Sequence, residues 1–224
     1  MKLRIWINFI AAFFLCIVVA QTVFAQESFS GEVGMKITDD EGNAMNLKYF
    51  IKDNLFRINS AADGQNIGVI FNSADKKMLM IMDDQKMYME MPMDMMNKYM
   101  ENNGDESNKE IDFKKTGETK KILDYTCEKW IYTGDDNNAE IWMAKNMGAF
   151  RFFDGGGMGK PKMKSGWEAE IEKSGYFPMQ VITRDKSGNI QSQMEVTSVT
   201  KKSLDDSFFK VPAGYQKFSM PNMQ

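Results

Sequence analysis

Apolar and polar residues alternate along most of the chain after residue 30, a pattern typical of strands with one face toward a core. Val33, Met35 and Ile37, for example, fall on one side of a strand and polar or small residues on the other. Clusters of Asp, Asn and Gly between such segments favour turns. Strands are expected at residues 31–38, 44–52, 55–59, 67–71, 78–82, 86–91, 111–113, 125–132, 139–144, 177–183 and 190–201. Short strands separated by turns predict an antiparallel meander.

The densest apolar pattern lies in residues 67–100, which hold ten of the chain's 21 methionines. Residues 78–82 are apolar on both faces, as expected of a strand that is covered on both sides. A turn at residues 83–85 leads into a strictly alternating segment, in which Met87, Met89 and Met91 share one face. This pattern predicts a hairpin with a methionine-rich face.

A short helix is expected directly after this hairpin. Pro92 can open a helix because its missing N–H is not needed in the first turn. Met93, Met96 and Met100 then recur at helical spacing. The polar residues 101–110 are expected to form an exposed loop.

The methionines permit three interpretations. Methionine is unbranched and polarisable, so it fills irregular cores and also lines adaptable binding surfaces. Thioether sulfur is in addition a soft ligand that selects Cu(I). The side chains could therefore form a filled core, line a cavity for a lipid or other apolar ligand, or handle copper. The candidate lining residues are Met78, Met80, Met82, Met87, Met89, Met91, Met93, Met96 and Met100.

The order of the expected elements predicts a mainly β protein of the α+β type. Strands do not alternate with helices, which argues against a parallel sheet. A large open antiparallel sheet must curl or be covered. We therefore expect a large curved antiparallel sheet, an unclosed half-barrel, covered by short helices. The Gly-rich residues 154–165 read as a flexible lid or linker, residues 146–153 as a short helix, and residues 204–215 as an extended tail that packs across the domain.

Residues 1–25 have the pattern of a secretory signal. Lys2 and Arg4 precede a mostly apolar stretch that is short for a membrane span, and Ala25 ends the small residues that a signal peptidase reads. Cleavage after Ala25 would leave residues 26–224 as one β-rich domain. We expect the product to be periplasmic or extracellular and not an integral membrane protein.

Composition narrows the functional classes. The formal net charge is −3 and no basic block is present, which argues against nucleic-acid binding. The chain has no histidine, so Ser-His and Cys-His catalysis and imidazole metal sites are excluded. After loss of the signal, Cys127 is the remaining cysteine, and we expect it to be buried rather than reactive. The sequence therefore predicts neither an enzyme nor a cofactor.

Residues 116–132, TGETKKILDYTCEKWIY, carry the first resemblance to a known family. Together with Ile141, Trp142 and the later FFKVPAGY, this segment resembles an exported bacterial family known as domain of unknown function 4412 (DUF4412). The family pattern has a Gly directly before the Tyr-x-Cys block, where this chain has Asp124.

Residues 49–61, YFIKDNLFRINSA, followed by MYMEMPM, are similar to the lipoprotein-localisation carriers LolA and LolB. Those proteins have an unclosed antiparallel barrel that holds helices and an apolar cavity for acyl chains. An Arg in this region helps to close their helical lid, so the resemblance implies a lid-closing role for Arg57. The alternative is a solvated strand residue that pairs with a carboxylate.

These observations leave two main functional hypotheses. The first is an envelope carrier that holds an apolar ligand, such as a lipid or an acylated protein, between the curved sheet and the methionine-rich helix. The second is a structural or protein-interaction module of the cell envelope with the same fold and a filled core. Methionine-based copper handling is a third, weaker possibility because histidine is absent.

Overall fold

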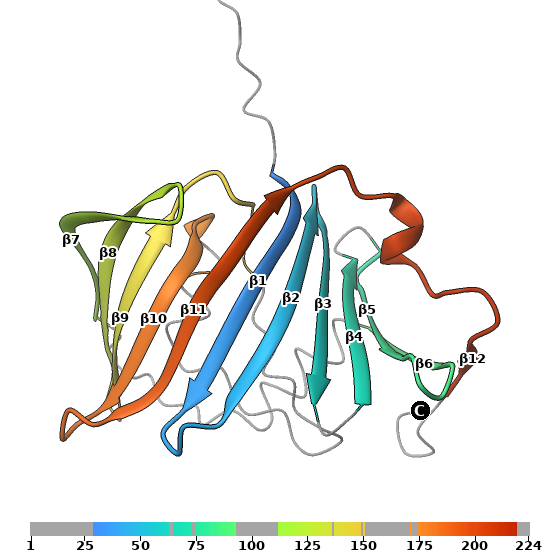
Figure 1. The fold of residues 1–224 in the computed structure, drawn as a ribbon, viewed down its shortest axis with the longest axis horizontal. Helices are drawn as coiled ribbons and strands as arrows, with labels where there is room; N and C mark the ends of the chain where they lie inside the picture. Colours follow the sequence, from blue (N-terminus) through green and yellow to red (C-terminus); the bar gives the residue numbers. More distant parts are fainter. Residues whose placement is uncertain are drawn as a thin grey trace, which may run out of the picture.

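The computed structural model of the protein describes residues 29–62, 65–72, 75–92, 112–135, 137–148, 150, 171 and 174–218. Within these ranges the chain forms a single twelve-stranded sheet with the order β12-β6-β5-β4-β3-β2-β1-β11-β10-β9-β8-β7 (Figure 1). The sheet is curved and does not close, since β7 and β12 lie at its opposite ends. The fold is therefore mainly β, with one large unclosed curved sheet, as the sequence predicted.

The strands agree closely with the expected segments. They are β1 (Ser30–Asp39), β2 (Ala44–Lys52), β3 (Leu55–Ala62), β4 (Gln65–Asn72), β5 (Lys77–Met82), β6 (Met87–Pro92), β7 (Asp112–Ile122), β8 (Tyr125–Thr133), β9 (Asn137–Ala144), β10 (Phe177–Asp185), β11 (Ile190–Lys201) and β12 (Gln216–Lys217). One expectation was wrong: β7 extends over eleven residues where only a short segment at 111–113 was expected. Of the short helix expected at residues 146–153, residues 146 and 147 form bends, and residues 149 and 151–153 lie outside the described residues.

The sheet consists of two antiparallel meanders, β1 to β6 and β7 to β11. They are joined in the middle by antiparallel pairing of β1 with β11, in which Gly31 lies opposite Lys201 and Asp39 opposite Ser192. β12 is the exception, because it pairs with β6 in parallel. The predicted antiparallel meander is thus confirmed for the eleven longer strands.

We call the face of the sheet that carries the larger core cluster the inner face. Register places Val33, Tyr49, Ile58 and Val69 side by side on it across β1 to β4. Tyr49 stacks on Phe150 with ring centroids 5.8 Å apart, so the segment after β9 packs against this face. The inner face therefore holds most of the apolar core.

The opposite, outer face has a second apolar cluster, confined to β2 to β6. Phe50, Ile70 and Ile81 are buried there under a segment that follows β11. This segment, residues 202–218, crosses the sheet end, forms the short 3-10 helix η1 (Asp206–Phe209) and ends in β12 (Figure 1). We call it the C-terminal strap. The sequence predicted a tail that packs across the domain, and the strap does so on the outer face.

Candidate functional site

The register of β5 and β6 aligns six methionines in three directly opposed pairs. Met78 lies opposite Met91, Met80 opposite Met89, and Met82 opposite Met87. Because side chains alternate between the two faces of a strand, all six project from one face. β4 continues this surface, with Phe71 opposite Met78, Val69 opposite Met80 and Ile67 opposite Met82.

This methionine face belongs to the inner face of the sheet, because Val69 pairs with the inner-face residue Ile58. Met78 and Met89 are buried, whereas Met80, Met82, Met87 and Met91 are only half-buried. The remaining candidate lining residues, Met93, Met96 and Met100, lie outside the described residues, so their helix remains a prediction.

The sequence predicted a strand covered on both sides at residues 78–82, whereas the described part of the structure shows a cover only on the outer face and leaves Met80 and Met82 half-buried. Leu79 and Ile81 point to the outer face, where Ile81 is fully buried beneath the C-terminal strap. The alternate residues form the methionine face. The β5–β6 hairpin is thus covered by the strap on its outer face and carries only methionines on its inner face.

The chemistry of the methionine face is apolar and adaptable. Paired thioethers on adjacent strands make contacts that tolerate differently shaped neighbours, which suits a loosely specified ligand. Six soft sulfur atoms are also the donor type that Cu(I) prefers. In the described ranges no group of three or more His, Cys, Asp or Glu side chains could hold a metal ion.

Arg57 lies on the outer face, on the opposite side of the sheet from the methionines. Its Nη1 donates a 2.9 Å hydrogen bond to the backbone oxygen of Phe208, and its Nε donates one of 2.8 Å to Asn59 Oδ1. The guanidinium carbon lies 4.5 Å from the centroid of the Phe208 ring. Arg57 is only 7% exposed, so the alternative of a solvated strand residue was wrong. It fastens the C-terminal strap, and a lid over the inner face would have to be closed by other contacts.

Two further contacts fasten the strap. Tyr215 Oη donates a 2.7 Å hydrogen bond to Asp83 in the β5–β6 turn, and this bond raises the pKa of Tyr215. Lys52 donates to the backbone oxygen of Leu204 at 2.7 Å and pairs with Asp206 at 2.5 Å. The strap is therefore tied to β2, β3 and the turn that carries the methionine hairpin.

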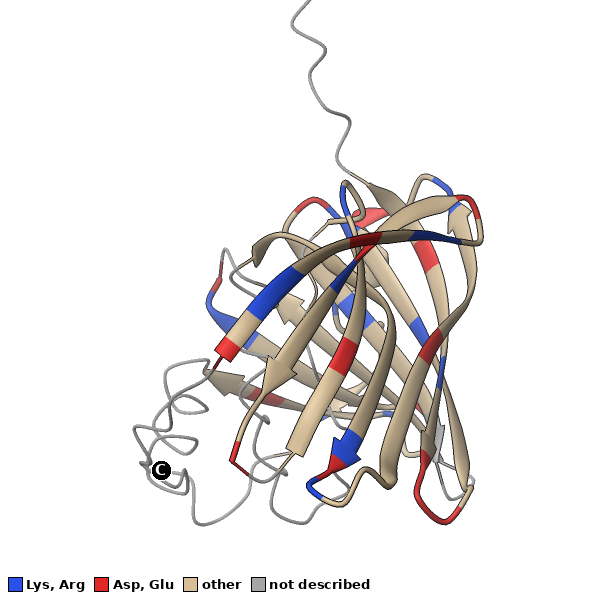
Figure 2. Cartoon of the chain, turned by 90° about the vertical axis from the view of Figure 1, so that its left-hand side faces the viewer, with Lys and Arg blue, Asp and Glu red and all other residues tan. Residues whose placement is uncertain are grey.

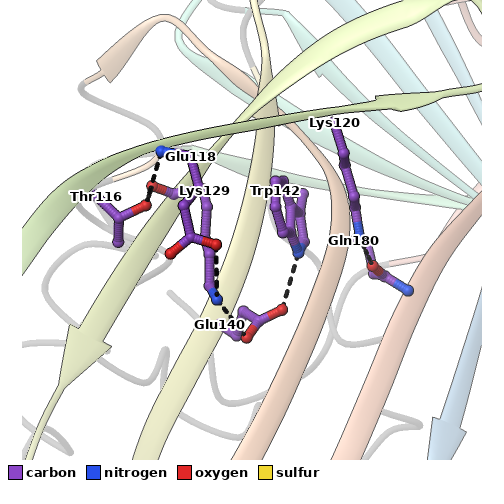
Figure 3. A network of polar contacts seen from close by, with 7 residues as sticks. All are labelled: Thr116, Glu118, Lys120, Lys129, Glu140, Trp142 and Gln180. Carbon is purple, nitrogen blue, oxygen red and sulfur yellow. Dashed lines mark hydrogen bonds and ion pairs between the residues drawn. The ribbon is translucent and has the colours of Figure 1, made fainter.

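A polar network occupies the outer face at the other end of the sheet (Figure 3). Lys120 Nζ lies 4.0 Å from the Trp142 ring centroid and donates a 2.6 Å hydrogen bond to Gln180 Oε1. Trp142 donates to Glu140 at 2.9 Å, and Glu140 pairs with Lys129 at 3.1 Å. Burial lowers the pKa of Lys120. The DUF4412-like segment thus stabilises the fold through this network.

Lys120 reaches Gln180 because β7 is bent. Its pairing with β8 is irregular between Lys115 and Thr119, and Gly117 in this bulge has a φ of 81°, which favours glycine.

Viewed from the β7 side, acidic and basic residues are dispersed over the strands and turns (Figure 2). Such a dispersed pattern gives no single charged surface on this side.

Cys127 lies opposite Lys120 in β7 and Ala144 in β9. It is fully buried, and burial raises the pKa of its thiol. The expectation of a buried cysteine is confirmed, and a raised pKa keeps the thiol in its unreactive protonated form.

Several solved structures are similar to this chain, although all are distant in sequence. An uncharacterised conserved protein from Thermus thermophilus matches with a TM-score of 0.52 and 10% identity, over 86% of this chain and 91% of that chain. The Pseudomonas aeruginosa MucA/MucB complex matches with a TM-score of 0.48 and 9% identity, over 88% of this chain and 60% of that chain. A putative outer membrane lipoprotein-sorting protein domain from Vibrio parahaemolyticus matches with a TM-score of 0.33 and 8% identity, over 83% and 90%.

The protein is thus of the mainly β class, with one large unclosed curved sheet that carries methionines at its β5–β6 end and a C-terminal strap on its outer face. The chain belongs to the family described as domain of unknown function DUF4412, whose model matches residues 29–215. A search of curated proteins gives no match. Within the described residues, no helix is long and apolar enough to cross a membrane.

Proposed function

We propose that this protein is an exported carrier or binding module that holds an apolar ligand on its methionine face. The observation that carries the proposal is the alignment of three Met–Met pairs on one face, four of the six side chains being only half-buried. A lipid acyl chain or the acyl group of a lipidated protein fits this chemistry. Each CH₂ group that leaves water there would contribute about 0.8 kcal/mol.

The location of the half-buried methionines supports a site at the β4–β6 end of the sheet. In the middle of the sheet the inner face is filled, since Val33, Ile141 and Phe177 are fully buried. A ligand would therefore lie over β5 and β6 rather than along the whole sheet. The predicted helix of Met93, Met96 and Met100 would then form its cover.

The proposal is tested by uptake of pyrene-labelled palmitate, measured as pyrene fluorescence. Met80→Lys should weaken uptake at least about tenfold, because a charge in an apolar site is costly. Met45→Lys is the matched control, since Met45 is also a half-buried inner-face residue but lies in β2. Uptake that is unchanged in Met80→Lys, or equally reduced in Met45→Lys, would contradict the proposed site.

The double variant Met80→Leu and Met89→Leu separates apolar binding from copper handling. Leucine preserves the apolar surface but removes the thioether ligands. We expect palmitate uptake to be retained. If the unmodified chain binds Cu(I) in competition with a chromogenic chelator and the double variant does not, the result would support the copper alternative instead.

A structural or protein-interaction module is the second candidate, and the filled inner face of β1, β9 and β10 favours it. Native mass spectrometry of protein purified from its own envelope distinguishes the two. A co-purifying acyl species supports the carrier, whereas a bare mass together with failure to take up palmitate supports the filled-core module.

A further inference from the structure

The two ends of the sheet differ in how their edges are protected. β7, at one end, is bent by its bulge and carries four lysines, Lys114, Lys115, Lys120 and Lys121. Bends and lysines are features that prevent an edge strand from pairing with other chains. β6, at the other end, is in regular register with β5, and its one charged side chain is Glu90.

β6 is covered by only two residues of β12. Gln216 donates its N–H to the backbone oxygen of Lys86 at 3.0 Å, and Phe218 donates its N–H to that of Tyr88 at 2.7 Å. Because backbone groups alternate in direction along a strand, the N–H and C=O of Glu90 point to the same side as those of Tyr88. Among the described residues, no strand pairs with β6 beyond Tyr88.

The side chains of β6 define what a neighbouring strand would carry. On the inner face, its residues would lie beside Met87, Met89 and Met91. On the outer face they would lie beside Glu90, which already pairs with Lys217 of β12 at 3.3 Å and with Lys77 at 2.8 Å. Apolar residues alternating with basic residues are therefore complementary to this edge.

We propose that the β6 edge accepts an extended segment of a partner protein by strand addition, and that β12 is the internal occupant which this segment replaces. The segment has about five residues and lies beside Met87 to Met91, because Pro92 at the end of β6 has no N–H to donate, and the apolar and basic side chains of the segment alternate. Backbone hydrogen bonds supply the affinity, and the alternating side chains supply the selectivity. This inference does not depend on the proposed acyl ligand, since pyrene-palmitate uptake and peptide binding are separate measurements.

The test uses the full exported chain and a fluorescein-labelled peptide of six alternating valine and lysine residues, followed by fluorescence anisotropy. Phe218→Pro removes the N–H that bonds to Tyr88, and the strand conformation of Lys217 tolerates a following proline. We expect Phe218→Pro to bind the peptide about fivefold to tenfold more tightly than the matched variant Phe218→Ala, because loss of one hydrogen bond of about 1 kcal/mol weakens the competing β12.

Glu90→Pro and Glu90→Ala separate backbone pairing from charge. Both lose the carboxylate, but only Glu90→Pro loses the outward N–H, while the bonds to β5 are made by Met89 and Met91. We expect Glu90→Pro to bind at least about fivefold more weakly than Glu90→Ala. A peptide whose backbone nitrogens are all methylated should not bind any variant. This control tests whether binding requires backbone hydrogen bonds, independently of the stability of the Glu90 variants. Equal binding of the methylated peptide, or no binding to Phe218→Pro, would overturn the proposal and leave β12 as a protective cap.

Discussion

The two halves of the sheet cover their outer faces by different means. On β2 to β6 the outer face is apolar and is covered by the C-terminal strap, a segment remote in sequence. On β7 to β10 it carries the Lys120–Trp142–Glu140 network, and the bent β7 covers it locally. The first half therefore depends on a distant part of the chain for its stability, whereas the second half is largely self-contained.

The largest effect is expected where the strap buries an outer-face residue completely. Ile81→Ala should lower the free energy of unfolding by about 3 kcal/mol, because it leaves a cavity beneath the strap. Ile182→Ala is the matched control, since Ile182 lies half-buried on the outer face of β10, where it should cost less than about 1 kcal/mol. Urea unfolding measures both, and similar losses would contradict the contrast between the halves.

Arg57→Met should cost about 2 kcal/mol, because it removes a charged hydrogen bond and leaves the Phe208 oxygen unpaired under the strap. Amide exchange in residues 204–215 should become faster, while exchange in β8 and β9 should not change. The exposed Arg184, replaced by Met, is the control and should have little effect. Unchanged exchange of the strap in Arg57→Met would show that other contacts hold it.

Lys120→Met tests the self-contained half and should cost only about 0.5–1 kcal/mol, the range of a cation–π contact that is partly open to solvent. The emission of Trp142 should shift, since the cation beside its ring is lost. Lys121→Met, at the exposed neighbouring position, should leave both properties unchanged. A loss as large as that of Arg57→Met would mean that the two halves are equally dependent on single contacts.

The smallest effect concerns pH. The hydrogen bond from Lys77, assisted by Lys217, lowers the pKa of Glu90 below its ordinary value of 4.5. A lowered folded-state pKa stabilises the protein above the unfolded-state pKa, and this stability is lost as the pH falls through the folded-state pKa. Glu90→Gln should therefore lose less stability than the unmodified chain between neutral pH and about pH 3.5. The difference should be small because Glu90 remains partly exposed. If the urea midpoints of Glu90→Gln and of the unmodified chain fall equally as the pH is lowered, the ionised Glu90 carboxylate does not contribute to stability.

The sequence was informative about strands and less so about their partners. Alternation places Met87, Met89 and Met91 on one face, but it contains no information on which strand lies opposite. The pairing of Met80 with Met89 follows from register, which the turn at residues 83–86 fixes only once the hairpin forms. The buried state of Cys127 was predictable because its residue type is rarely exposed.

Arg57 and the strap show where pattern analysis fails. A charged residue in an alternating strand is normally solvated, so the strand pattern by itself predicted that Arg57 is exposed. The resemblance to the lipoprotein-localisation carriers suggested a different role, the closing of a lid. Its burial depends on Phe208, which lies far away in sequence. Likewise, the continuous apolar run at residues 78–82 indicated a cover on both sides, but no local signal identified the strap as the outer cover.

The central pairing of β1 with β11 has a consequence for the order of folding. All other antiparallel pairs join strands that follow one another in the chain, so each meander forms by local hairpins, whereas the β1–β11 ladder closes a loop that spans nearly the whole domain. Such long-range pairing is slow because chain entropy must be lost before contacts form. During synthesis, β1 is therefore an unpaired edge strand until residues 190–201 emerge. We expect the rate-limiting step of folding to be the pairing of β1 with β11 rather than the formation of either half.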